Sequence, residues 1–356
     1  MVSEAYSFSS VGVIIVDYAL PFSVVVAAIY LAIVRFMDLN EKEPIWALGL
    51  MLVLGTIAAV IVDLLAGDVL LGPSTLWQAL VEASALFVAF YLGAVALTGV
   101  ARMRGWSEIN DLMDGMVYGT AVGFGYAVGE TIVRELMFGQ IYEIRDPGVL
   151  ATLGTTALWG LSYGLFGAII GAGFGAAVGA HSALRRIVYI VAGLIGAILT
   201  HWLYDFLAHG GPLGGTASLA RTWVTLLIPL LFVIVVAGLA FFREGRVIRE
   251  ELADESQTGS VTEEELAVLT SSIARRSHRT RALGNWNFHK WHVTRELHDR
   301  QVQLALAKRR AREEPRPEHR IAIEHEVERL RASVHALKSE LGVPTRSPDA
   351  SRGGPS

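Results

Sequence analysis

Seven long apolar stretches occupy the first two thirds of the chain. The hydrocarbon core of a bilayer is about 30 Å thick, and a helix needs about 20 mainly apolar residues to cross it. Stretches of about this length cover residues 11–35, 45–65, 76–98, 115–133, 151–178, 187–208 and 221–242. No Lys or Arg precedes the first stretch, so we expect it to remain as a spanning helix and not to act as a cleaved signal peptide. The pattern predicts an all-α, polytopic transmembrane helix bundle of about seven spans over residues 1–242.

The pattern changes beyond residue 242, where the long apolar stretches give way to shorter segments of helix-forming composition. Thr262 and Glu265 have the spacing of a capping box, which opens a helix. Residues 243–341 are therefore predicted to form a helical tail. Residues 342–356 are rich in Ser, Pro and Gly and are predicted to be disordered.

One segment of the tail carries a coiled-coil repeat. Its apolar residues alternate spacings of three and four, as a heptad seam requires, and they are Val327, Leu330, Val334, Leu337 and Leu341. We expect this seam to pack against the preceding tail helix, at about 286–311. A coiled coil with another protein is the alternative.

Positive charge is unequally divided between the two sets of connections that join the apolar stretches. One set carries nine Lys and Arg residues, namely Arg35, Lys42, Arg102, Arg104, Arg185, Arg186, Arg243, Arg246 and Arg249. The opposite set carries only Arg134, Arg145 and Arg221. Because cytoplasmic loops are enriched in Lys and Arg, we predict an amino terminus outside and a tail in the cytoplasm. The expected location is the bacterial cell membrane.

Composition supports this division and excludes several classes of protein. Of the 356 residues, 53% are hydrophobic and only 18% are charged, whereas an ordinary soluble domain carries about 25% charged residues. Zero cysteines exclude a disulfide framework, thiolate metal sites and Cys nucleophiles. The formal charge is −7 before residue 243 and +3 from there on, and this small positive charge argues against a nucleic-acid partner.

Glycines recur every four residues in two of the predicted spans. They are Gly115, Gly119 and Gly123 in the fourth, and Gly167, Gly171, Gly175 and Gly179 in the fifth. This spacing puts each set on one helix face, and small residues let membrane helices approach closely. We expect close packing within the bundle, with a homodimer seam as the alternative.

Four ionisable side chains lie inside predicted spans: Glu82, Glu130, His201 and Asp205. Ionisable groups within membrane helices are costly, and they are usually functional or mutually paired. Glu82 follows the start of its span by six residues, which places it about 9 Å in from the outer side at 1.5 Å per residue. The other three lie near the outer ends of their spans, and His201 and Asp205 share a helix face. We predict that all four converge around a cavity open to the outer face.

This cluster admits three interpretations. As a catalytic site, a carboxylate would orient the imidazole and Glu82 would act on water. As a structural feature, the groups would only fix the register of the helices through hydrogen bonds. An ion pathway is disfavoured because the charges cluster at one depth. One imidazole with three carboxylates is also a poor zinc ligand set, so we expect no metal and no other cofactor.

Three segments resemble motifs of the PrsW family of intramembrane proteases, in the wider group that includes the type II CAAX prenyl proteases. The first is Glu41-Lys42-Glu43-Pro44 before the second span. The second runs from Asp114-Gly115-Met116-Val117-Tyr118-Gly119 to Glu130 and is similar to the DG-x-VYG…G-x-GFA…EN segment of the family. The third is His201-Trp202-Leu203-Tyr204-Asp205, which resembles the late H-x-x-x-N/D motif. The resemblance implies intramembrane proteolysis. The first segment also has the form of a helix entry, with Pro44 near the first turn, and we assign it no catalytic role.

The chain also departs from the family pattern. Where the family shows Glu-Glu-x-x-Lys, this sequence has Glu82 followed by Ala83, with Leu86 in place of the Lys. Thr131 replaces an Asn, and Thr156 stands where the family tends to place a His. Part of the hydrolytic apparatus of the family is therefore absent from this chain.

Two functions follow as hypotheses. The first is a PrsW-like endopeptidase that cleaves a membrane protein, with single-pass proteins as candidates, near the outer face. Glu82 would deprotonate water, with His201 and Asp205 supporting the base or the developing oxyanion, and with Glu130 in the same site. The alternative is a catalytically silent homologue that binds membrane helices or scaffolds a signalling complex, with a partner bound through the seam of the tail. In both cases the lipid bilayer is the environment of the bundle.

Overall fold

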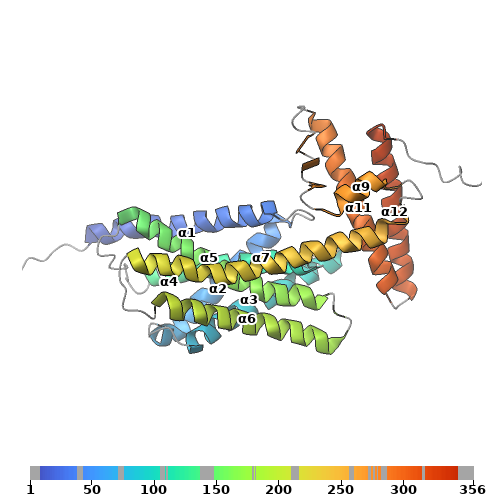
Figure 1. Ribbon diagram of the computed structural model, residues 1–356. Helices are drawn as coiled ribbons and strands as arrows, with labels where there is room; N and C mark the ends of the chain where they lie inside the picture. The colour runs from blue at the N-terminus through green and yellow to red at the C-terminus, as the bar shows by residue number, and fades with distance from the viewer. Residues whose placement is uncertain are drawn as a thin grey trace, which may run out of the picture. The chain divides into compact units, whose positions relative to one another are not determined.

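The computed structural model describes most of the chain as helix. It describes residues 9–37, 43–70, 76–104, 109, 111–136, 148–178, 180, 182–209, 216–255, 260–271, 274–275, 277–278, 280–281, 287–314 and 317–343. Within these ranges there are ten helices and no strand, as the all-α prediction expects (Figure 1). They are α1 (Ser9–Met37), α2 (Ile45–Leu70), α3 (Leu76–Arg104), α4 (Leu112–Leu136), α5 (Gly148–Val178), α6 (Ala183–His209), α7 (Thr216–Leu252), α9 (Glu263–Leu269), α11 (Phe288–Glu313) and α12 (Pro317–Glu340).

The chain divides into two compact units. Among the described residues, the first unit ends at residue 236 and the second begins at residue 237. Each of the seven apolar stretches lies largely or wholly within one of the helices α1 to α7. The predicted disordered segment at 342–356 lies outside the described residues from residue 344 onward.

Four helices are long and apolar enough to cross a bilayer in the described part of the chain. The candidate spans are Ile45–Leu65, Leu76–Val100, Gly160–Val178 and Ala183–Leu207. The chain is therefore a multi-pass membrane protein, and the full count of seven spans stays a prediction.

Helix α4 is the centre of the first unit. It packs against α1, α2, α3 and α5, and every residue from Asp114 to Glu130 is buried. Tyr118, Phe124 and Tyr126 are among its largest fully or almost fully buried side chains. Neighbouring helices thus surround this glycine-rich helix, which explains how it tolerates more polar residues than a helix that faces lipid.

The periodic glycines bring the backbones of α4 and α5 together. A Cβ atom added to Gly115, Gly119 or Gly123 would overlap with the carbonyl oxygen of Gly171, Gly167 or Tyr163, respectively. Only residues without a side chain permit this approach. The prediction of close packing within the bundle is confirmed for these residues, whereas Gly179 lies outside the described part.

A second glycine contact joins α4 to α2. A Cβ atom on Gly125 or Gly129 would overlap with the carbonyl oxygen of Leu52 or Thr56, respectively. The Thr56 hydroxyl donates a hydrogen bond to the carbonyl oxygen of Gly125 over 3.0 Å. Backbone contacts therefore hold α4 between α2 and α5.

The second unit is a helical tail with its own apolar core. Its core includes Ile248 and Leu252 of α7, Val302 of α11, and Val327 and Leu330 of α12. The seam of the predicted heptad therefore packs within the chain through these α12 residues, which agrees with the expected packing against the preceding tail helix.

Two details of the tail helices bear on the sequence predictions. The capping box at Thr262 and Glu265 is confirmed, since each side chain accepts a hydrogen bond from the backbone of the other. Val334 is also buried, but the next buried position of α12 is taken by Lys338 and not by Leu337. The ammonium group of Lys338 lies 2.7 Å from the Glu265 carboxylate.

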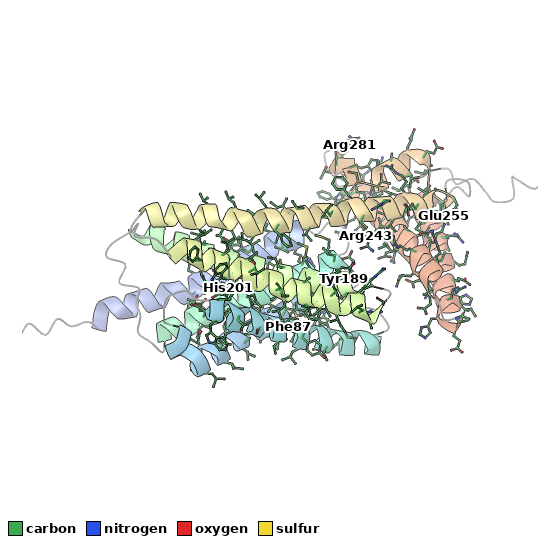
Figure 2. All side chains as sticks on the ribbon, turned by 60° about the horizontal axis from the view of Figure 1, so that its bottom comes forward. Phe87, Tyr189, His201, Arg243, Glu255 and Arg281 are labelled. Atoms are coloured by element: carbon green, nitrogen blue, oxygen red, sulfur yellow. The ribbon has the colours of Figure 1, made fainter. Side chains whose placement is uncertain are left out.

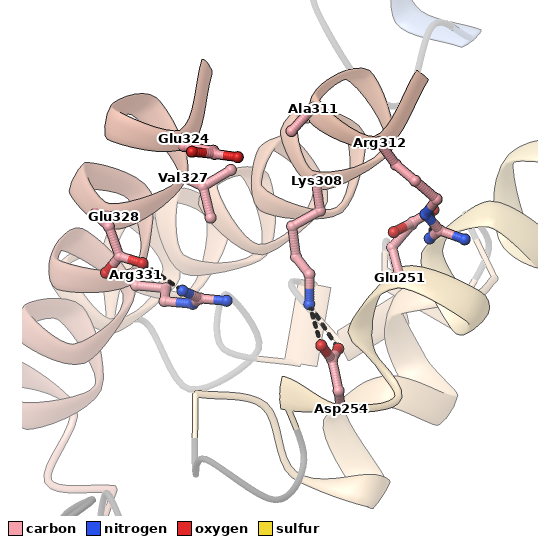
Figure 3. A pocket seen from close by; sticks show the side chains of 9 residues that line it. All are labelled: Glu251, Asp254, Lys308, Ala311, Arg312, Glu324, Val327, Glu328 and Arg331. Carbon is pink, nitrogen blue, oxygen red and sulfur yellow. Dashed lines mark hydrogen bonds and ion pairs between the residues drawn. The ribbon is translucent and has the colours of Figure 1, made fainter. Parts of the chain in front are cut away.

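Mainly acidic and basic side chains line a pocket of about 440 Å³ in the tail (Figure 3). Beside it, the Glu255 side chain is 1% exposed and accepts hydrogen bonds from Arg331 over 2.6 Å and from Lys308 over 2.9 Å. Burial alone would raise the pKa of the Glu255 carboxyl, but these hydrogen bonds and the charges of the two bases lower it from 4.5 to about 2. Glu255 is therefore ionised and paired at neutral pH.

Candidate active site

Three helices bring polar side chains together in the interior of the first unit. Glu82 comes from α3, Tyr163 from α5, and His201 and Asp205 from α6. The Nε2 atom of His201 lies 3.3 Å from an oxygen of Glu82 and 3.3 Å from an oxygen of Asp205. The imidazole therefore stands between two carboxyl groups, and Figure 2 shows His201 among the helices of the bundle.

Glu82 has hydrogen-bonding partners on both carboxylate oxygens. The Tyr163 hydroxyl donates to Oε2 over 2.6 Å, and the Gln78 amide donates to Oε1 over 3.0 Å. Gln78 precedes Glu82 by one helical turn, which places the two side chains on the same face of α3. The carboxylate is thus held by its own helix and by α5.

The site is closed in this structure. The exposed fractions are 2% for Glu82 and His201 and 6% for Asp205. Charges that are removed from water cost free energy unless they are paired and hydrogen-bonded, and the mutual contacts of these groups supply such pairing. Hydrolysis at this site would therefore need a movement that admits water and a substrate.

Aromatic rings fix the orientation of the imidazole. Phe166 stacks on His201 with a centroid distance of 4.5 Å and an interplanar angle of 20°. The ring of Tyr163 meets His201 edge-on at 5.6 Å. Packing on a face and at an edge leaves the imidazole little freedom to rotate, so Nε2 is kept toward the carboxyl groups.

Glu130 lies on the central helix α4, close enough to His201 for their charges to interact. It is 2% exposed. The structure thus brings Glu82, His201 and Asp205 into direct contact and places Glu130 in electrostatic range of the same imidazole.

Two residues of the cluster were not identified by sequence reasoning, namely Gln78 and Tyr163. Gln78 could have been found as a polar side chain one turn before a buried Glu. Tyr163 gave no signal, because a single Tyr in an apolar stretch is ordinary. Its position depends on the glycine contact between α4 and α5, where Gly123 meets its backbone.

A second buried pair of a Glu and a Tyr lies elsewhere along α4. The Tyr118 hydroxyl donates a hydrogen bond to the Glu43 carboxylate, and both residues are buried. Tyr118 and Glu130 are twelve residues apart on α4, which corresponds to about 18 Å along a helix. The Glu43 pair therefore ties the start of α2 to α4, about three helical turns from Glu130.

Comparison with known proteins found one family. A family model described as PrsW family intramembrane metalloprotease matches residues 43–239, which is more than half of the chain. No curated protein and no solved structure matches the chain. The matched region contains every residue of the polar cluster, and the resemblance inferred from the sequence motifs is confirmed.

The family description names a metal ion, which requires a suitable set of ligands. Among the residues that the structure describes, no group of three or more His, Asp or Glu side chains is arranged to hold one. Catalytic zinc sites commonly use three His or two His and a Glu, whereas this cluster supplies the single imidazole of His201. The donor set present here does not fit such an ion.

Proposed function

The chain belongs to the PrsW family of intramembrane metalloproteases, and from this membership we propose that it is an endopeptidase that hydrolyses a transmembrane protein near the outer face of the membrane. The observation that carries the proposal is the buried contact of His201 with Glu82 and Asp205. Activation of water can use a carboxylate base together with an imidazole and a second carboxylate, when the three groups lie within hydrogen-bonding reach of one another.

In the proposed mechanism, Glu82 is the general base. It takes a proton from a water molecule while the water oxygen attacks the carbonyl carbon of the scissile peptide. The tetrahedral intermediate carries its negative charge on the former carbonyl oxygen, where an N–H group of His201 stabilises it. Glu82 then delivers the proton to the amide nitrogen, and the C–N bond breaks to give a carboxylic acid and an amine.

Asp205 supports this step by acting on His201. Its carboxylate lies one helical turn beyond the imidazole and 3.3 Å from Nε2. A carboxylate at this distance favours the imidazole form that carries a proton on Nε2. Glu130 of α4 lies within electrostatic range of the same imidazole.

The substrate class follows from the surroundings of the site. Peptide bonds in a transmembrane helix are protected by their internal hydrogen bonds, so the substrate must unwind locally before attack. The cluster is expected near the outer ends of the spans. A single-pass protein with a short unwound segment near its own outer end would fit a site at this depth.

The test is proteolysis in proteoliposomes that contain purified protein and candidate single-pass substrates. Glu82→Gln keeps the shape of the side chain but removes its basicity, so cleavage should fall by about 10²–10⁴-fold. Glu43→Gln is the matched control, because Glu43 is also buried and also bonded to a Tyr but lies away from the cluster. Equal cleavage by wild type and Glu82→Gln would remove Glu82 from the mechanism.

One observation favours a silent homologue as the second candidate function. Ala83 and Leu86 occupy the positions where the family shows an acid and a Lys, and both are fully buried in the apolar core. Both positions therefore contribute apolar side chains to the core, in place of the charged pair of the family. Absence of cleavage of every candidate by correctly folded wild type would support a scaffold that binds membrane helices.

A further inference from the structure

We propose that Tyr163, together with Gln78, is a positioning residue that holds the Glu82 carboxylate in the orientation needed for proton transfer. This inference rests on the proposed function, because it concerns the same general base. None of the motifs that carry the family resemblance contains either residue.

The two carboxylate oxygens of Glu82 accept hydrogen bonds from different donors. Oε1 accepts from Gln78 and Oε2 accepts from Tyr163, at 3.0 Å and 2.6 Å. The terminal torsion of a Glu side chain is broad, so a single donor would leave the plane of the carboxylate free to turn. Two donors on different helices define that plane.

Tyr163 is itself held by contacts on several sides. Its ring packs on Tyr126 with a centroid distance of 4.9 Å and meets Phe166 edge-on at 6.0 Å. Its carbonyl oxygen sits against Gly123 of α4, where a Cβ atom would not fit. These contacts hold the ring in the position from which its hydroxyl group reaches Glu82.

The hydrogen bond from Tyr163 to Glu82 is short and therefore strong. An O–H group that donates to a carboxylate over 2.5–2.7 Å makes a charge-assisted hydrogen bond, which is about twice as strong as a neutral one. The shared oxygen of Glu82 also lies 3.3 Å from His201. Tyr163 thus sets the angle at which the base faces the imidazole, and a misplacement of about 1 Å in such a site can cost about 10²-fold in rate.

The experiment uses Tyr163→Phe in the full-length protein in proteoliposomes, with kcat and KM measured separately. Phe keeps the ring contacts and removes the hydroxyl alone. We expect kcat to fall by about 10–100-fold with KM nearly unchanged. In the Glu82→Gln background the same substitution should cause no further loss, because residues that act as a unit are not additive.

Tyr118→Phe is the matched control, since it removes another buried hydroxyl that donates to a Glu, here Glu43. Its kcat should stay at the wild-type value, which separates loss of position from general loss of stability. Should Tyr163→Phe fail to fold, as judged by thermal unfolding, Gln78→Met removes the other hydrogen bond of Glu82 and should lower kcat in the same manner.

Three results would overturn the inference while leaving Glu82 as the base: unchanged kcat in folded Tyr163→Phe beside an inactive Glu82→Gln, an effect on KM alone, or a full additional loss in the double variant. Unchanged cleavage by Glu82→Gln would instead remove Glu82 as the base, and absence of cleavage by folded wild type would overturn the proposed function. The two failures are therefore distinguishable in one set of proteins.

Discussion

The buried Glu255 of the tail provides a quantitative test of the forces that hold the second unit together. We consider Glu255→Gln, which keeps the size of the side chain and removes its charge. Glu328→Gln is the matched control, because Glu328 pairs with the same Arg331 over 2.5 Å but is 67% exposed. The two variants thus differ mainly in the burial of the carboxylate.

The expected magnitude follows from the pKa of Glu255. A decrease from 4.5 to about 2 corresponds to about 3 kcal/mol of stability at neutral pH. Arg331 is 30% exposed and Lys308 is 14% exposed, so water screens part of the interaction. We therefore expect Glu255→Gln to destabilise the tail by about 2 kcal/mol, and Glu328→Gln by less than about 0.5 kcal/mol.

The same linkage predicts the pH dependence. The carboxyl group of Glu255 has a lower pKa in the folded state than in the unfolded state, so its contribution is fully present above about pH 4.5 and is lost as the pH falls toward 2. The difference in stability between wild type and Glu255→Gln should fall to less than about half of its neutral value by pH 3.

The assay is hydrogen exchange of the α12 amides in the full-length protein in detergent micelles, with exchange times scaled for the intrinsic rate at each pH. The free energy of opening of Pro317–Glu340 reports the stability of the tail without requiring that the tail fold alone. Equal opening free energies for Glu255→Gln and Glu328→Gln at pH 7 would refute the reasoning. So would a difference that persists undiminished at pH 3.

Two further predictions concern the bundle. Gly119→Leu should lower the yield of folded protein and abolish cleavage, because the added side chain would overlap with the backbone of α5. Gly49→Leu is the control, because no atom lies within 4 Å of a Cβ added there. It should behave as wild type in size-exclusion and activity assays. A reporter fused after Arg243 should be cytoplasmic, and one inserted at 71–75, between α2 and α3, should be external. Reporters on one side would contradict the predicted depth of the cluster.

The helices of the bundle could be predicted from the sequence because crossing a bilayer imposes a length and a composition. The end of α7 shows where this reasoning stops. The apolar stretch ends at residue 242, where Arg243 begins the charged segment, but α7 continues to Leu252. A charged residue ends a membrane span, not a helix, and the apolar face of Ile248 and Leu252 is buried in the tail core.

The candidate site could be predicted in part for a related reason. Glu82, His201 and Asp205 stand out because ionisable groups are rare in apolar stretches, so each is visible without a structure. Tyr163 is not visible in this way, since its role depends on a contact between helices that are far apart in the sequence. Lys338 could not be predicted in the tail core because its partner Glu265 is likewise distant, and because the heptad pattern favours its apolar neighbour Leu337.

The enclosure of Glu82 and His201 has a consequence for inhibitors of the proposed protease. A compound directed at these groups can bind only after the helices part. Its apparent affinity is therefore the intrinsic affinity multiplied by the fraction of molecules that are open. Its inhibition should therefore develop slowly and increase with preincubation. Any compound that binds only the open form also shifts the population toward that form.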